Sequence, residues 1–477
     1  MYQRFLEAYP EFATTVTLDD LRATEYSRLD SLRQTYLDYT GGGLYAASQL
    51  RDHLALLATN VFGNPHSKNL TSLAMGMRVE TTRLDVLRFF NASPDEYMVI
   101  FTPNSTGALK LLGESYPFEL GSVFALTADN HNSVNGIREF ARRKEATVAY
   151  VPIVAPELRV DESALWDVLK SAPEAPSKLF AFPAQSNFSG VQHPLEWITE
   201  ARELGWDVLL DAASFVPSNP LDLRQVHPDF VDISFYKIFG YPTGVGCLLV
   251  RKASAHKLLR PWYAGGTITF STVATMDHYL TPGPAAFEDG TVNYLSVPAV
   301  TIGIEHIESI GIDVIHTRVM CLTGWLLDQL PTIRHSNGNP VVRIYGPTTT
   351  DRRGATLQTN FFDPDGARID SYVTERMATA ERISLRAGCH CNPGAREAAL
   401  GFTRDDLATC FADTDTMTFD QFRRNIVGKT TGALRLSVGL ATNFADVERY
   451  LHFARSFIDR PIDEIMKGPA AVGYVGA

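Results

Sequence analysis

Short apolar segments recur through the first half of the chain, and their spacing is the feature that most constrains the fold. Each has the length of a buried strand, and the stretches between them have helical periodicity or are rich in turn residues. The segments are residues 97–102, 122–128, 147–152, 179–182, 205–210, 230–235 and 247–250. Strands that alternate with helices are typical of βα units, so the sequence predicts an α/β fold with a mainly parallel sheet.

Charged residues follow two neighbouring segments. Asp211 comes directly after residues 205–210, and Lys237 follows residues 230–235 and precedes a glycine-rich turn. Ligands bind outside the carboxyl ends of the strands in open α/β sheets. A lysine held there can act as a Schiff-base nucleophile, and a carboxylate can keep a pyridine nitrogen protonated. The pair therefore indicates one site for pyridoxal 5'-phosphate (PLP), with a surface lysine and a turn aspartate as the alternative.

Hydroxyl groups near these charges are available for a phosphate. Ser105 and Thr106 open a predicted helix directly after residues 97–102, where exposed backbone N–H groups and the helix dipole favour phosphate. Ordinary N-capping explains the same two residues. Ser234 and Tyr236 flank Lys237, and we expect them on alternate faces of an extended run from which they could reach phosphate or substrate.

Two cysteines stand just before another predicted helix. Asn392 and Pro393 fit the N-cap and the first helical position, which leaves Cys391 beside the helix N-terminus, where the dipole stabilises a thiolate. Cys389 lies two residues earlier, and a pair of buried structural thiols is the competing interpretation. The other cysteines lack the spacing that would complete a four-ligand metal site, so no metal is expected. They are Cys247, Cys321 and Cys410.

Residues 211–216 (DAASFV) and 234–244 (SFYKIFGYPTG) resemble the class V aminotransferase-type enzymes, which are PLP proteins of fold type I. Within them the chain is most similar to the cysteine desulfurase-like domain of molybdenum cofactor sulfurases, from about residue 37 to about residue 445. The resemblance implies a PLP-dependent transferase fold of type I, in which a large domain has a mainly parallel seven-stranded sheet and a smaller α/β C-terminal domain follows. We expect an N-terminal arm at 1–36, the large PLP-binding domain at 37–310, and the small domain at 311–477.

The resemblance also implies a set of cofactor-binding residues. They are Ser105, Thr106, His131, Asn187, Asp211, Ser214, Ser234, Tyr236, Lys237 and Thr291. His131 would stack on the pyridine ring and transfer protons, and Asn187 would hydrogen-bond the phenolic oxygen of the cofactor and contact the substrate. Without the resemblance, a loop histidine and an Asx turn explain these two residues. Thr291 would bind the phosphate of a partner subunit, which implies a homodimer.

Two residues of the predicted small domain would act on the substrate. Arg435, in a strand-like segment at 433–439, resembles the arginine that grips the substrate carboxylate, and Cys391 resembles the sulfur acceptor. A strand arginine could instead pair with a structural acid. The predicted enzyme is a PLP-dependent cysteine desulfurase, a sulfurtransferase with Lys237, Cys391 and His131 as catalytic residues.

Sulfur would pass from L-cysteine through a persulfide on Cys391 to an acceptor protein or small molecule, with release of alanine. Molybdenum cofactor sulfurases carry a further C-terminal domain, and this chain ends soon after Arg435, so we expect a separate partner or a different acceptor. The alternative is a class V enzyme that acts as a transaminase, a C–S or C–C lyase or an epimerase on another amino acid, since the shared site does not set the fate of the α-anion. A non-catalytic sulfur-relay or scaffold protein is a third interpretation.

Composition argues against several other classes of protein. The net charge of −11, from 54 acidic and 43 basic residues, disfavours a broad nucleic-acid surface. No apolar run reaches the roughly 18 residues of a membrane span, and the first residues lack the apolar region of a secretory signal. Five cysteines do not suggest a disulfide framework. We therefore expect no membrane or nucleic-acid partner and a cytoplasmic location.

Overall fold

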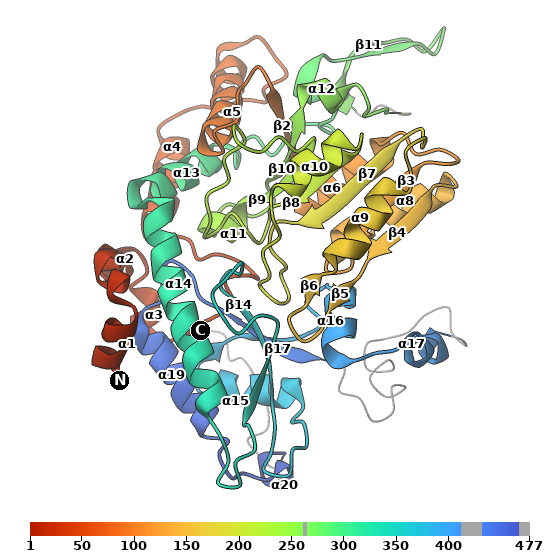
Figure 1. The fold of residues 1–477 in the computed structure, drawn as a ribbon. Coiled ribbons are helices and arrows are strands. Elements are labelled where there is room, and N and C mark those ends of the chain that lie inside the picture. The colour runs from red at the N-terminus through yellow and green to blue at the C-terminus, as the bar shows by residue number, and fades with distance from the viewer. Residues whose placement is uncertain (261–264, 412–431, 467–477) are drawn as a thin grey trace.

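The computed structural model describes residues 1–260, 265–411 and 432–466 (Figure 1). Its largest sheet has seven strands in the order β2, β10, β9, β8, β7, β3, β4. They are β2 (Tyr97–Thr102), β3 (Val123–Thr127), β4 (Thr147–Val151), β7 (Lys178–Pro183), β8 (Asp207–Asp211), β9 (Phe230–Ser234) and β10 (Gly246–Arg251). β10 is antiparallel to β2 and β9, and the other pairings are parallel. The predicted mainly parallel seven-stranded sheet is confirmed.

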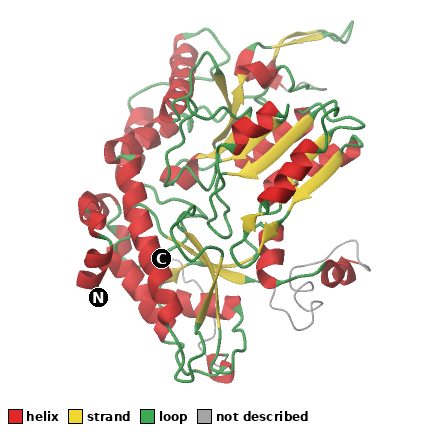
Figure 2. Cartoon of the chain, in the orientation of Figure 1, coloured by secondary structure: helices red, strands yellow, loops and turns green. Residues whose placement is uncertain are grey.

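Helices cover both faces of this sheet (Figure 2). They include α6 (Ser105–Ser115) and α8 (Ile137–Arg143) on one face, and α9 (Glu162–Lys170) and α10 (Trp197–Glu203) on the other. In β7, Leu179 and Ala181 join the hydrophobic cluster under the first pair, and Phe180 and Phe182 join the cluster under the second. Because both faces of the sheet are buried, its strands are mostly apolar along their length. The carboxyl ends of the parallel strands lie together at one edge of this packed sheet.

A second, antiparallel sheet has the order β13, β14, β17, β16. Its strands are β13 (Val342–Tyr345), β14 (Thr356–Phe361), β16 (Arg386–Gly388) and β17 (Ala433–Ser437), and the nearby helices are α15 (Ser371–Ala380), α16 (Pro393–Leu400) and α19 (Phe444–Arg455). Between the two sheets in the chain come α13 (Pro298–Ile310) and α14 (Ile312–Gln329). They meet at Gly311, whose φ of +89° breaks the helix.

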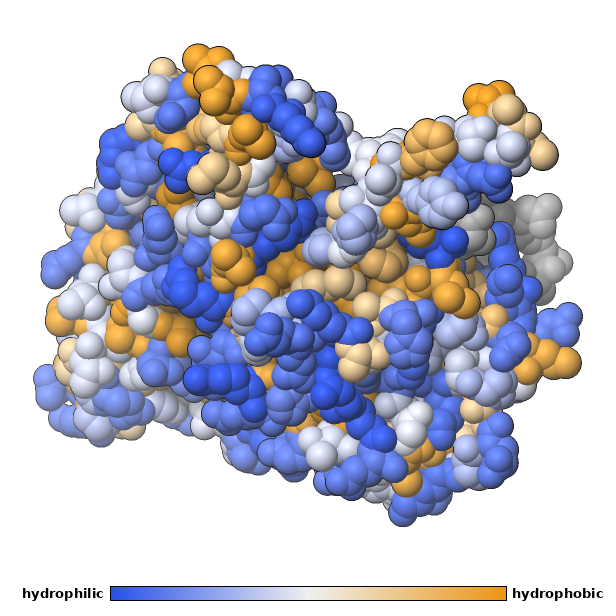
Figure 3. Space-filling view, turned by 90° about the horizontal axis from the view of Figure 1, so that it is seen from above, coloured by the Kyte–Doolittle hydropathy of each residue, from blue (hydrophilic) through white to orange (hydrophobic). Residues whose placement is uncertain are grey.

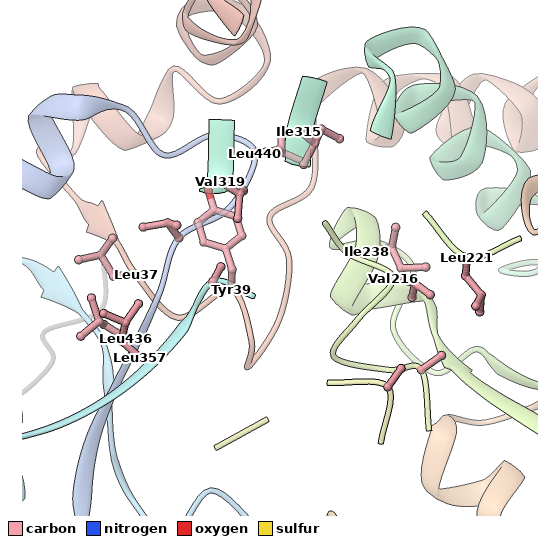
Figure 4. Close-up of a cluster of buried hydrophobic side chains, with 14 of the residues drawn as sticks. Leu37, Tyr39, Val216, Leu221, Ile238, Ile315, Val319, Leu357, Leu436 and Leu440 are labelled. Atoms are coloured by element: carbon pink, nitrogen blue, oxygen red, sulfur yellow. The ribbon is translucent and has the colours of Figure 1, made fainter. Parts of the chain in front are cut away.

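One hydrophobic cluster continues through both parts of the chain. Figure 4 shows Val216 and Ile238 near the large sheet, Leu357 and Leu436 in the second sheet, and Val319 of α14, all buried members of this cluster. The predicted boundary near residue 310 coincides with the break at Gly311, but the shared core does not separate the parts. The division into an arm and two domains therefore stays a prediction.

The N-terminal residues form short helices that lie against α14. They are α1 (Tyr2–Ala8), η1 (Pro10–Thr15), α2 (Thr17–Glu25) and α3 (Arg28–Ser31). The chain then enters β1 (Thr35–Tyr36), which pairs in parallel with β15 (Ile383–Ser384). This pairing places the residues after β1 beside the second sheet.

The remaining elements are short or peripheral. They are α4 (Ala47–Ala58), α5 (Leu70–Phe89), α7 (Asn132–Asn135), β5 (Ile153–Val154), β6 (Arg159–Val160), α11 (Phe235–Phe239), α12 (Lys252–Ala255), η2 (Gly265–Thr267), β11 (Ile268–Ser271), β12 (His278–Leu280), η3 (Gly283–Ala286), η4 (Leu330–Thr332), α17 (Arg404–Phe411) and α20 (Ile462–Ile465). Within the described ranges no single helix is long and apolar enough to span a membrane, although the bent pair of α13 with Ile312–Thr332 passes that test as a unit.

Candidate active site

A cavity of about 450 Å³ opens where the carboxyl ends of β7, β8 and β9 approach the second sheet. Predicted residues from both parts of the chain line it: Ser105, Thr106, His131, Asn187, Asp211, Ser214, Ser234, Tyr236, Lys237, Cys391 and Arg435. Thr291 does not. It is exposed and lines an adjacent cavity of about 480 Å³, which shares Pro103 and Gly244 with the first.

Asp211 and Lys237 form the charged centre of the first cavity. Asp211 is the last residue of β8, it is buried, and its Oδ1 accepts a 3.0 Å hydrogen bond from the Ala213 backbone N–H. Burial raises the pKa of this carboxyl, while the Lys237 ammonium and the Ala213 N–H oppose the rise. A buried acid beside a lysine in a cavity is typical of a functional site.

The predicted extended run around Lys237 is wrong. Tyr236 and Lys237 lie in the one-turn helix α11, because Phe235, Ile238 and Phe239 are buried at helical spacing. The helix ends at Gly240, with φ of +77°, where any side chain would collide with the backbone of the residues that pass over it. Lys237 is therefore presented to the cavity from a fixed helical turn.

The N-terminus of α6 forms one wall of the cavity. Asn104 caps the helix by accepting a 2.9 Å hydrogen bond from the Gly107 N–H, so Ser105 and Thr106 are its first residues, as predicted. The hydroxyls of Thr106 and Ser133 lie 2.8 Å apart, and the Ser105 hydroxyl donates to the buried carboxyl of Asp232. The free N–H groups of this helix end favour a phosphate.

His131 faces the same cavity from the start of α7. Its Nδ1 accepts a 3.2 Å hydrogen bond from the Ser133 N–H. Burial, together with the charges of Lys237 and Arg435, lowers the pKa of His131 to about 4. The imidazole is therefore neutral near pH 7, the form that packs on a ring or accepts a proton.

Arg435, in β17, also lines the cavity and is buried. Its Nη1 donates to the Asn187 carbonyl at 3.1 Å, and its Nη2 donates to the Asp38 carboxylate at 3.0 Å. Its Nε is buried and has no hydrogen-bond partner among the described residues. A buried donor left free in this way fits an acceptor that a ligand supplies.

Cys391 lies on the loop between β16 and α16 and is exposed at the cavity, whereas Cys389 is half-buried. Asn392 caps α16 by accepting a 3.2 Å hydrogen bond from the Ala395 N–H, and Pro393 is the first helical residue. The predicted cap is confirmed. Cys391 thus stands directly before a helix N-terminus and opens into the same space as Lys237.

Hydrogen bonds tie the cysteine loop to the large sheet. The Asn132 N–H donates to the Cys391 carbonyl and the Asn187 side chain donates to the His390 carbonyl, both at 2.7 Å. The Asn187 side chain also accepts from Asn392 at 2.9 Å. His390 and Cys391 both have φ of +54°, which non-glycine residues rarely adopt. Asn187 therefore shapes the loop, and its contact with a cofactor stays a prediction.

Sequence reasoning missed further residues of this site. Among them, Asp38, Ser133 and Asp232 hydrogen-bond to predicted residues, and Arg386 lines the cavity and pairs with Asp38. Asp232 is a carboxyl group inside an apolar segment, which was an available signal. The sequence around Asp38 contained no such signal, because the partners of Asp38 lie hundreds of residues away in the sequence. In the part of the chain that the structure describes, no group of three or more His, Cys, Asp or Glu residues could hold a metal ion.

The residues of this cavity fit PLP. A helix N-terminus suits its phosphate, a buried acid suits its ring nitrogen, and a lysine lines the same cavity, whose volume is of the size that holds small molecules. The neutral imidazole of His131 suits a ring face. Arg435 and its free Nε remain for the carboxylate of an amino acid.

Comparisons with known proteins agree with this assignment. The family model described as aminotransferase class-V matches residues 35–450. The molybdenum cofactor sulfurase of Solanum lycopersicum is 36% identical, over 92% of this chain and 57% of its own length. That of Homo sapiens is also 36% identical, over 92% of this chain and 51% of its own length. The chain thus spans little more than half of the curated relatives it matches.

Solved structures share the fold. A cysteine desulfurase from Thermococcus onnurineus NA1 superposes with a TM-score of 0.75 at 21% identity, covering 92% of this chain and 97% of that one. The cysteine desulfurase CsdA from Escherichia coli gives a TM-score of 0.71 at 20% identity, covering 94% and 98%.

Proposed function

The chain belongs to the class-V aminotransferase family, and from this premise we propose that it is a PLP-dependent cysteine desulfurase. It would move sulfur from L-cysteine through a persulfide on Cys391 to an acceptor and release alanine. One observation carries the proposal: an exposed thiol opens into the cavity that holds Lys237, Asp211 and Arg435. A transaminase has no need of a thiol at that position.

The cofactor would be held by the residues that line the cavity. Lys237 would bind it covalently, Ser105 and Thr106 with the α6 N-terminus would bind its phosphate, and Asp211 would pair with its ring nitrogen. Ser214, Ser234 and Tyr236 line the same space. Bound PLP supplies an electron sink for the α-carbon of an amino acid.

The protein itself positions the substrate and moves its protons. Arg435 would receive the α-carboxylate on its free Nε and a neighbouring N–H, as guanidinium groups bind carboxylates. The amine of Lys237, once released, would take the α-proton, and the neutral His131 is a second acceptor in reach of the cavity.

Cys391 would carry out the sulfur transfer. Its thiolate would form an S–S bond with the substrate sulfur while the substrate C–S bond breaks, and the electron pair of that bond would return to the carbon, which is then protonated. The products are alanine and a Cys391 persulfide, so atoms and electrons balance. A thiol or other nucleophile of the acceptor, a protein or a small molecule, would then take the outer sulfur.

We further propose a homodimer in the cytoplasm. Thr291 is exposed and lines the second cavity rather than the first, which supports the proposed contact of Thr291 with the cofactor phosphate of a partner subunit. The described cysteines Cys247, Cys321, Cys389 and Cys391 are free thiols, which supports a reducing compartment.

The test is product analysis on the purified protein with PLP and L-cysteine. We expect alanine and protein-bound sulfane sulfur from the wild type, and addition of a thiol reductant should release that sulfur as sulfide. Cys391→Ser should retain the visible absorbance of Lys237-bound PLP and lose sulfur transfer by at least about tenfold, since its hydroxyl is a far weaker nucleophile toward sulfur.

The matched control is Cys389→Ser, which removes a thiol two residues away that does not line the cavity. It should keep most of the activity. Persulfide formation that continues in Cys391→Ser would exclude Cys391 as the acceptor. Transfer of the amino group to a keto acid, without sulfur release, would favour a transaminase instead.

A further inference from the structure

Asp38 lies between the two arginines that line the candidate active site. Its Oδ1 accepts a 3.0 Å hydrogen bond from Arg435 Nη2, and its Oδ2 accepts from Arg386 Nε at 3.1 Å and Nη2 at 2.6 Å. The side chains of Asp38 and Arg435 are 12% and 3% exposed, and that of Arg386 is 50% exposed. Both oxygens of one carboxylate are thus shared between two guanidinium groups at the cavity wall.

The backbone places these three groups together. Arg386 in β16 and Arg435 in β17 are register partners, so their side chains emerge side by side from one face of the sheet. Like charges directly opposite each other are destabilising, and Asp38 offsets this repulsion. The residues after β1 run alongside β17, so the backbone of Asp38 forms a parallel β-bridge with Ser437, close to this pair.

Gly41 allows the loop after Asp38 to wrap closely around the ion pair. A Cβ atom at Gly41 would lie 2.5 Å from Arg386 Nη2 and 2.6 Å from Asp38 Oδ2. Real Cβ atoms do not approach so closely, so a side chain at residue 41 would displace the Asp38 carboxylate or the Arg386 guanidinium. The loop therefore packs directly against the ion pair.

The net charge at this end of the cavity follows from the three groups. Two guanidinium groups and one carboxylate leave a single positive charge. The other charged lining residues, Asp211 and Lys237, oppose each other, and burial lowers the pKa values of His131 and His390 so that both are neutral. One positive charge matches one substrate carboxylate.

We propose that Asp38 is a positioning and specificity-determining residue that sets the charge of the substrates this site accepts. It holds Arg435 in place for the α-carboxylate and neutralises Arg386. Amino acids with an uncharged side chain, such as L-cysteine, then bind in preference to those with a second anionic group, such as L-aspartate or L-cysteine sulfinate. The inference rests on the proposed function in one respect: an amino acid binds with its carboxylate at Arg435.

The test compares two amino acids that differ by one charge. L-Asparagine and L-aspartate have nearly the same shape, and their equilibrium binding to the PLP-loaded protein is measured by calorimetry. We expect the wild type to bind L-asparagine about tenfold or more tightly than L-aspartate. In Asp38→Asn, Arg386 loses its carboxylate partner, so the variant should bind L-aspartate more tightly than L-asparagine. The ratio of the two affinities should change by about a hundredfold.

The charge-balanced control is the double variant Asp38→Asn with Arg386→Gln. It restores a net charge of one, so it should return the binding ratio to near the wild-type value, whereas Arg386→Gln alone should weaken both ligands. A merely structural role for Asp38 predicts no such restoration. The double variant also removes the repulsion between the arginines, so it folds even where Asp38→Asn does not, and its ratio still decides the proposal.

A binding ratio that stays unchanged in Asp38→Asn, or a double variant that keeps the reversed preference, would overturn the proposal. Failure of the proposed function is a separate result: the wild type would then release no sulfur from L-cysteine, whatever the binding ratio. A charge-dependent ratio without sulfur release would keep Asp38 as a specificity residue of a different class V enzyme.

Discussion

Asp232 is a buried carboxyl group in the middle of an apolar strand. It is the register partner of Asp211 in the neighbouring parallel strand, and it is fully buried. Burial raises the pKa of Asp232 well above its ordinary value, the charge of Asp211 raises it further, and the Ser105 hydroxyl opposes the rise. The folded protein therefore keeps a proton on Asp232 that the unfolded chain releases.

Asp232→Asn should make the stability of the protein less dependent on pH. Because the folded pKa lies above the unfolded value of about 4, Asp232 reduces stability progressively as the pH rises from there to the folded pKa. An asparagine keeps a polar group beside Ser105 and does not ionise. We expect a gain of about 1–3 kcal/mol in unfolding free energy at pH 8 and little gain at pH 5.

Urea unfolding at the two pH values measures this difference. The exposed Asp365→Asn serves as the control for a carboxylate lost from the surface, and it should change stability little at either pH. An equal loss of stability at pH 5 and pH 8 in Asp232→Asn would show that the carboxyl is ionised in the folded protein.

The sequence predicted the residues that follow strands. Ser105, Asp211 and Lys237 each come directly after an apolar segment, and strand ends meet at one edge of a parallel sheet, so local order alone brought them together. Asp38 and Arg386 could not be found this way. They meet only because β1 pairs with β15, and nothing in either segment specifies that partner.

At the scale of elements, one buried arginine, Arg318 of α14, connects the N-terminal helices to the rest of the molecule. The Arg318 side chain is 1% exposed. It donates to the Thr15 hydroxyl at 2.7 Å, to the Thr15 carbonyl at 2.6 Å and to Asp19 at 2.8 Å. Its guanidinium also lies 4.2 Å from the centre of the Phe12 ring. A single side chain of α14 thus fixes both η1 and α2.

Arg318→Met should destabilise the protein strongly. Methionine keeps most of the volume but leaves the buried Thr15 groups without their donor, so we expect a loss of about 2–4 kcal/mol in unfolding free energy. Chemical denaturation measures it. The control is Arg88→Met, whose arginine is half-exposed and pairs with Glu308 and Asp85 at the surface; it should cost about 0–1 kcal/mol. Equal losses in the two variants would contradict the role given to Arg318.

Most elements were predictable because their burial follows a simple period. The strands of the large sheet are mostly apolar, and all seven overlap the segments predicted for them. α11 was not predicted. Its five residues also fit a strand in the sequence. In the structure Phe239 of α11 packs so closely on α13 that Gly303 has no room for a side chain, a contact that the sequence does not specify.

At the scale of the whole molecule, apolar side chains gather at the end that carries α4, α5 and the β11–β12 hairpin. Figure 3 looks down on this end and shows hydrophobic patches on it. The exposed residues are Leu50, Leu54, Leu70, Leu73, Met77 and Leu84 on the two helices, and Phe270, Val273, Met276 and Tyr279 on the hairpin. Exposed apolar residues gathered on one part of a surface favour a protein partner, as the proposed homodimer would supply.

Met77→Glu should dissociate the dimer. The Met77 side chain is 72% exposed on α5, and a charge there would be buried without a partner on association. Light scattering should show a dimer for the wild type and a monomer for the variant, with weaker binding of PLP because the proposed contact of Thr291 with the partner's cofactor would be lost. Leu120→Glu, which adds a charge at a residue 74% exposed on a loop, should stay dimeric. A wild-type monomer that binds PLP fully would contradict the assembly.

The overall architecture was predictable because the resemblance covers most of the chain. The contacts between the two parts of the chain were not predictable. Arg353 illustrates the reason. It is buried, and its guanidinium donates to the carbonyls of Gly354 and Thr356 in its own segment and to that of Ser189, which lies 164 residues away in the sequence. Contacts of a side chain with distant backbone leave no periodic trace in a sequence.

The hydrogen bonds of the cysteine loop bear on how the proposed persulfide would leave the protein. The carbonyls of His390 and Cys391 accept hydrogen bonds from Asn187 and Asn132, so the backbone of the loop cannot swing outward as a carrier arm without breaking those bonds. Under the proposed function, the acceptor would therefore have to approach Cys391 where it lies at the cavity.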